Sequence, residues 1–144
     1  MLEFLGLVVA QVVGVLLGAL LNAALLIWRA LKLRNWVIHY RNAYVVSIKA
    51  GFVAVVCADV ATIAVALVGG TNDKLLDNVG LLFGLVGWWF MHSSALIKLA
   101  GSANPITVKD ARALSASVFS FGILFFLAIG VGVLLIFLAL KALK

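Results

Sequence analysis

The chain has 144 residues, of which 66% are hydrophobic and 11% are charged, and its mean hydropathy is +1.26. A soluble fold of this length leaves too much surface exposed to bury so large an apolar fraction, so the composition excludes an ordinary soluble domain. The formal net charge is +6, but the basic residues lie beside long apolar segments, which indicates contact with a membrane surface and no nucleic-acid binding. The single cysteine, Cys57, excludes an internal disulfide.

Four segments are long and apolar enough to cross a bilayer, which takes about 20 predominantly apolar residues. In chain order they cover about residues 5–28, 44–68, 75–99 and 113–140. Unbroken apolar runs of this length exclude the short alternating strands of a membrane barrel. The sequence therefore predicts an all-α polytopic membrane protein, in which residues 1–144 form a single four-transmembrane-helix antiparallel bundle with short loops. Thr107, with Asp110 three residues later, predicts the cap at which the last helix begins.

Glycines recur at a four-residue spacing in two of the predicted spans. The first span carries Gly14 and Gly18, and the third carries Gly80 and Gly84. Glycine at this spacing lets two helix backbones approach closely, which is how helices gain contact in lipid. The simpler interpretation is packing within the bundle, and the alternative is a stripe that faces outward and contacts a second copy or another subunit.

Asp59 lies near the middle of the second predicted span. A charged carboxylate there costs about 2.5–3.5 kcal/mol on insertion scales, so such a residue is normally paired, hydrated or protonated. At 1.5 Å per residue it lies about 15 Å from the end of its helix, where no basic side chain of this chain is expected. We expect Gln11 and Thr62 to be its hydrogen-bond partners, and we interpret the three residues as a candidate ion or proton site.

A second polar group is predicted nearer the basic side of the bundle. It consists of His92, Ser94, Asn22, Lys49 and Ser120. One interpretation is an interhelical cluster that only fixes packing, at about 0.6–2 kcal/mol per hydrogen bond. The alternative is a polar half-channel or substrate pocket in which the histidine titrates.

No cofactor, metal or catalytic site is predicted. The two histidines, His39 and His92, are expected at different depths, so they cannot ligate one haem or share one metal ion. Ser93 and Ser94 follow His92 on the same helix, where neighbouring side chains diverge, and no third group orients the histidine as a base. We therefore expect a protein that is not an enzyme.

The basic residues favour one side of the predicted bundle, with eight of the eleven lysines and arginines in or beside the first and third connections. The positive-inside rule places that side in the cytoplasm and both termini outside it, and we expect a bacterial inner membrane. Candidate contacts for lipid headgroups are Arg29, Lys32, Arg34 and Arg41.

Two functions from different classes fit these patterns. The first is a small integral-membrane subunit or assembly component of a larger complex, which works by helix contacts with other membrane subunits or with further copies of itself. The second is a small oligomeric ion or proton-coupled channel or transporter in which Asp59 titrates.

Overall fold

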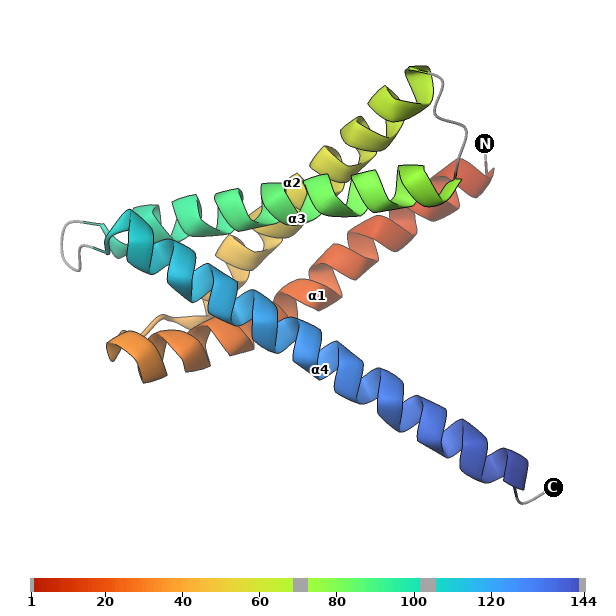
Figure 1. Cartoon of the computed structure of the whole chain (residues 1–144). Coiled ribbons are helices and arrows are strands. Elements are labelled where there is room, and N and C mark those ends of the chain that lie inside the picture. Colours follow the sequence, from red (N-terminus) through yellow and green to blue (C-terminus); the bar gives the residue numbers. More distant parts are fainter. Residues whose placement is uncertain (1, 69–72, 102–105, 143–144) are drawn as a thin grey trace.

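The computed structural model describes residues 2–68, 73–101 and 106–142, and every regular element in these ranges is a helix (Figure 1). In chain order the helices are α1 (Leu2–Arg34), α2 (Tyr40–Leu67), α3 (Asp73–Ala100) and α4 (Val108–Ala142). The predicted all-α class is confirmed, and α1, α2 and α3 are long and apolar enough to cross a membrane. The fourth predicted span lies inside α4. Many side chains of this helix are not among those that the structure describes, so the membrane crossing of α4 stays a prediction.

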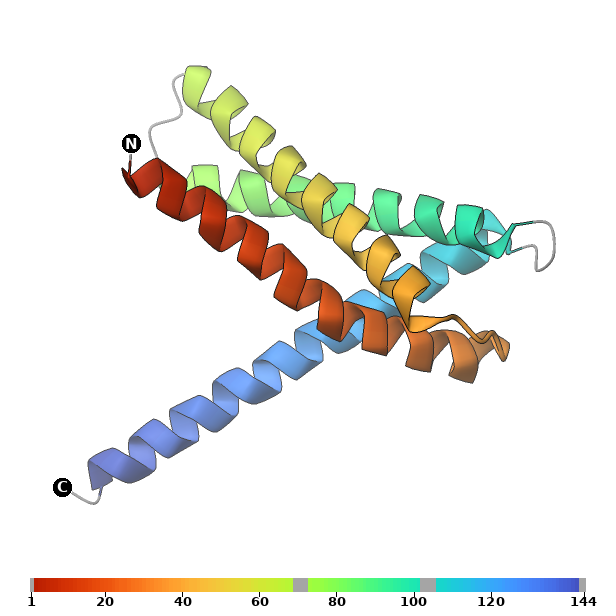
Figure 2. The same cartoon turned by 180° about the vertical axis from the view of Figure 1, so that it is seen from behind.

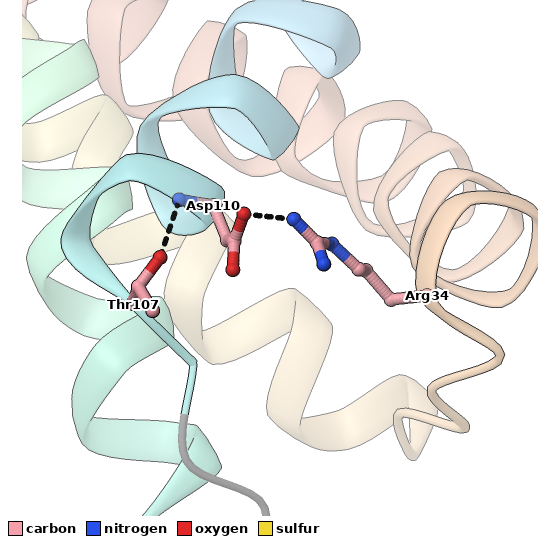
Figure 3. A network of polar contacts seen from close by, with 3 residues as sticks. All are labelled: Arg34, Thr107 and Asp110. Carbon is pink, nitrogen blue, oxygen red and sulfur yellow. Dashed lines mark hydrogen bonds and ion pairs between the residues drawn. The ribbon is translucent and has the colours of Figure 1, made fainter.

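Local backbone chemistry ends α1 and α3 and begins α4. Asn35 (φ 50°) and Gly101 (φ 58°) adopt the left-handed conformation that asparagine and glycine tolerate best, and each follows the last residue of its helix. The Thr107 hydroxyl accepts a hydrogen bond from the Asp110 amide at 3.1 Å, which confirms the predicted cap (Figure 3).

Each helix contacts two of the other three. α2 and α3 share the most extensive interface, α1 contacts α2 and α4, and α3 also contacts α4. Successive helices run in alternating directions, but the second half of α4 leaves the other three after crossing α1 (Figures 1 and 2). The predicted bundle therefore closes over only part of its length.

The buried core lies at one end of the molecule. There α1 and α3 finish while α2 and α4 begin, and we call this the basic end and its opposite the open end. The core combines leucines with alanines, whose small side chains let the four helices meet closely. Its members are Ala23, Leu26, Ala30, Ile38, Ala43, Val46, Leu96, Ala111, Leu114 and Val118.

Toward the open end, many large apolar side chains are exposed. Leu17, Val60, Leu82 and Ile123 each expose between 45% and 61% of their surface. Exposed apolar side chains on all four helices are suited to contact with lipid or with another protein.

The glycines of α3 pack directly on α2. A Cβ atom added at Gly84 would lie 3.1 Å from the Ala54 carbonyl oxygen and 3.3 Å from the Ala58 Cβ. A Cβ added at Gly80 would lie 2.5 Å from the Thr62 hydroxyl. The α3 stripe is therefore used within the chain, because only glycine permits this separation of the two helices.

Candidate functional site

A cavity opens between the helices beside the α2–α3 interface. Its volume is about 540 Å³, and residues from all four helices line it. The described residues of its wall are apolar or glycine apart from three polar side chains, Gln11, Asn22 and Ser47. Such a surface suits an apolar occupant better than a continuous file of water molecules, which needs several polar partners for each molecule.

The glycine stripe of α1 faces this cavity. Gly14 and Gly18 both line it, and no described atom lies within 4 Å of the position that a Cβ would take at either residue. Gly122 of α4 lines the same cavity and is equally open. The two predicted glycine pairs thus differ, because the α3 pair is filled by α2 while the α1 pair meets open space.

The structure places Gln11 and Asp59 side by side toward the open end. Gln11 Nε2 donates to both carboxylate oxygens of Asp59, at 3.2 Å and 3.4 Å, and the carboxylate is exposed on the isolated chain. Thr62 is half-buried, and its hydroxyl is directed at Gly80 of α3. Within the described residues no hydrogen bond joins Thr62 to Asp59, so two of the three predicted site residues come together.

His92 is fully buried between α3 and α4. Its Nδ1 lies 2.8 Å from the Ser115 hydroxyl, and the Trp88 ring stacks on the imidazole at 4.6 Å. Ser93 Oγ donates to the Trp89 carbonyl at 2.6 Å and lies 3.2 Å from Ser115 Oγ. His92 Nε2 is buried without a hydrogen-bond partner among the described atoms.

The number of hydroxyl protons in this cluster determines which atom donates in each hydrogen bond. A carbonyl only accepts, so the single Ser93 proton is used at the Trp89 carbonyl. The remaining two contacts are both hydrogen bonds only if Ser115 donates to Ser93 and His92 Nδ1–H donates to Ser115. When the imidazole is neutral, Nε2 in that arrangement carries a lone pair and no proton, which makes it a buried acceptor without a partner among the described atoms.

The other members of the predicted polar group lie elsewhere. Asn22 lines the cavity, and Ser120 donates to the Ala116 carbonyl of its own helix at 2.9 Å. Lys49 and Ser94 line a separate groove between α2 and α3. The group predicted from depth alone is therefore divided among four places, because helix rotation directs side chains of similar depth to different neighbours.

Ser115, which sequence reasoning missed, is the partner that His92 contacts. Its position along the helix could have identified Ser115 as the partner. His92 lies eight residues before the end of α3, and Ser115 lies seven residues after the start of α4. In antiparallel neighbours these positions fall within about 2 Å in height.

Two of the four residues predicted to contact lipid headgroups, Arg29 and Arg34, form contacts that join α1 to α4. Arg29 Nε donates to the Ser117 hydroxyl at 2.6 Å, and its guanidinium lies 4.6 Å from the centre of the Phe121 ring. Arg34 forms an ion pair with Asp110 at the start of α4 (Figure 3). Lys32 lies over the Trp28 ring at 5.4 Å, and Arg41 lines the groove between α2 and α3.

Comparison with known proteins finds no matching family model, no similar curated protein and no similar solved structure. Among the described residues, no group of three or more His, Cys, Asp or Glu side chains is placed to hold a metal ion.

Proposed function

We propose that the chain is an integral-membrane subunit or assembly component of a larger complex, and that it works through helix contacts in the bilayer. The observation that carries the proposal is the cavity whose α1 wall includes Gly14 and Gly18, with no described atom of another helix within 4 Å of either Cβ position. Three apolar helices of membrane-spanning length and the exposed apolar surface toward the open end support a location in lipid.

The occupant we propose for the cavity is a transmembrane helix of another subunit. Lipid chains adapt to almost any apolar surface, whereas a glycine stripe adds most when a second backbone packs against it. Asp59 is exposed at the same open end, where a polar or basic side chain of the partner would offset its cost in the membrane. Further copies of this chain are the alternative source of that helix.

The proposal includes a fourth span in α4, a cytoplasmic basic end and both termini on the opposite side. The support is that the core and the Arg34–Asp110 pair lie at the end where basic residues are concentrated. A bacterial inner membrane is the location we propose.

The test is association in native membranes. We expect Gly18→Leu to reduce comigration of the chain with its complex at least tenfold on native gels, because the larger side chain occupies the space of the partner backbone. Gly6→Leu is the matched control, since this α1 glycine also meets open space but lies outside the cavity.

Photo-crosslinking from position 18 identifies the occupant. A crosslink to another protein supports a heteromeric subunit, and a crosslink to a second copy supports a homo-oligomer. A chain that migrates as a monomer both as wild type and as Gly18→Leu, without a crosslink from position 18, would overturn the proposal.

A second candidate function is ion or proton movement at Asp59. The observation that favours it is the exposed carboxylate held by the Gln11 amide. The apolar cavity wall argues for the subunit function first, because an ion path needs polar groups along its whole length.

A further inference from the structure

A second groove, distinct from the cavity, lies between the first part of α2 and the last part of α3. We call it the basic groove; its volume is about 430 Å³. Its polar lining is Arg41, Asn42, Lys49, Ser94 and Lys98, and its apolar lining is Val45, Val46, Met91, Ala95 and Leu99.

Three cations face this groove without an acid to balance them. Arg41, Lys49 and Lys98 are exposed, and no aspartate or glutamate is among the described residues that line the groove. The ion pair found among the described residues, Arg34 with Asp110, joins α1 to α4 and leaves these three cations unneutralised. Because like charges in one groove repel one another, a bound anion would be stabilised there.

The residue spacing on α2 and α3 places the three cations on the faces that line the groove. Arg41, Val45 and Lys49 are spaced by four residues and share one face of α2. Met91, Ser94 and Lys98 follow the three- and four-residue spacing that gives one face of α3. Packing of α2 on α3 sets these faces beside each other, so the groove is built by the best-packed pair of helices.

Charge and apolar surface are separated along the groove. Arg41 is one residue from the start of α2, and Lys98 is two residues from the end of α3, so both lie at the basic end. Lys49 lies about 12 Å beyond Arg41 along α2 and is long enough to direct its ammonium back toward that end. The apolar residues form the walls between these charges.

We propose that the basic groove binds the phosphate headgroup of an anionic phospholipid. Arginine forms bidentate hydrogen bonds to phosphate, lysines add point charges, and the amide and hydroxyl groups of Asn42 and Ser94 complete the polar lining. The apolar walls accept the upper part of an acyl chain. This inference rests on the proposed membrane location, but it does not depend on the partner helix in the cavity.

The test is lipid retention by the purified full chain, measured by native mass spectrometry in detergent with added phosphatidylglycerol or phosphatidylcholine. We expect phosphatidylglycerol to bind at least tenfold more tightly than phosphatidylcholine. The groove variant Arg41→Gln, Lys49→Gln and Lys98→Gln should lose at least tenfold in phosphatidylglycerol affinity, because each basic group near the headgroup contributes to the attraction.

The matched control removes the same charge outside the groove, through Lys74→Gln, Lys109→Gln and Lys141→Gln. These three lysines are exposed and do not line the groove. We expect the control to keep affinity within about threefold of wild type. Equal losses in the groove and control variants would overturn the proposal, because they would reduce the attraction to a general effect of net charge.

Inorganic phosphate distinguishes the two sources of the anion. We expect about 10 mM phosphate to leave phosphatidylglycerol bound, because the free ion lacks the acyl contact with the groove walls. Displacement of the lipid by phosphate at that concentration would overturn the lipid assignment and indicate a free-anion site.

The conservative variant Lys49→Arg should retain lipid, and circular dichroism verifies that each variant stays helical. Loss of lipid retention with unchanged comigration in native membranes separates this site from the subunit function. Absence of the wild-type chain from the membrane fraction would instead remove the basis of both proposals.

Discussion

A carboxylate in an apolar helix is stabilised only when a neighbour shares its charge or its hydrogen bonds, and for Asp59 the neighbour is an amide. Gln11 was expected as a partner because it lies at a similar depth on an antiparallel helix, and the structure brings the two together. Thr62 was expected for its sequence spacing, but its hydroxyl is directed at α3. Depth can be read from sequence, whereas the direction of a side chain around the helix is set by packing.

Replacement of Asp59 by asparagine tests the ion-site candidate. Asparagine keeps the size of the side chain and can still accept from Gln11 Nε2, but it cannot ionise. If this carboxylate titrates during transport, Asp59→Asn should lower proton flux in proteoliposomes at least tenfold, as followed with an enclosed pH-sensitive dye.

Asp77→Asn is the matched control, because Asp77 is also an exposed carboxylate but lies in the second turn of α3, away from Gln11. Equal flux in the two variants would exclude Asp59 as the ion site and leave the subunit function as the remaining candidate.

At the scale of a helix, the same four-residue glycine spacing has two outcomes. The sequence predicted both pairs as packing faces but did not distinguish which would be filled within the chain. Gly80 and Gly84 meet α2, whose facing residues include Ala54 and Ala58, while Gly14 meets open space. Spacing identifies a face that permits close approach, but the partner is decided by which helix carries small residues at the matching height.

Substitution on the two stripes should therefore give unequal effects. We expect Gly84→Leu to destabilise the isolated chain by about 1–3 kcal/mol, because its added atoms overlap the α2 backbone. Gly14→Leu should change stability by less than about 0.5 kcal/mol, since nothing described lies within 4 Å of its Cβ position. Denaturant unfolding in micelles measures both, and a larger loss for Gly14→Leu would contradict the packing described above.

For the whole molecule, the sequence predicted helix number, order and alternating direction but not the open end. The hydropathy of a span is satisfied by lipid or by protein, so it cannot indicate where a bundle closes. The four helices of this bundle pack together at the basic end, where the alanines Ala23, Ala30, Ala43 and Ala111 are buried. The second half of α4 separates from the other helices (Figures 1 and 2), and the α4 residues that line the cavity, Val118, Phe119, Gly122 and Ile123, belong to its first half.

Spin-label distances between α1 and α4 test whether this opening is a property of the free chain. With Cys57 replaced by alanine, labels at positions 32 and 109 report the basic end, and labels at positions 7 and 127 report the open end; all four residues are exposed. We expect the basic-end pair to give the shorter and narrower distribution in nanodiscs, because the core and the Arg34–Asp110 pair hold that end.

In native membranes, a partner helix in the cavity should narrow the open-end distribution without changing the basic-end one, because a ligand selects the arrangement of α1 and α4 to which it binds best. An open-end distribution as short and narrow as the basic-end one in the free chain would mean that α4 itself closes the bundle. The cavity would then be filled from within, and Gly14 and Gly18 would serve the chain's own packing instead of a partner's.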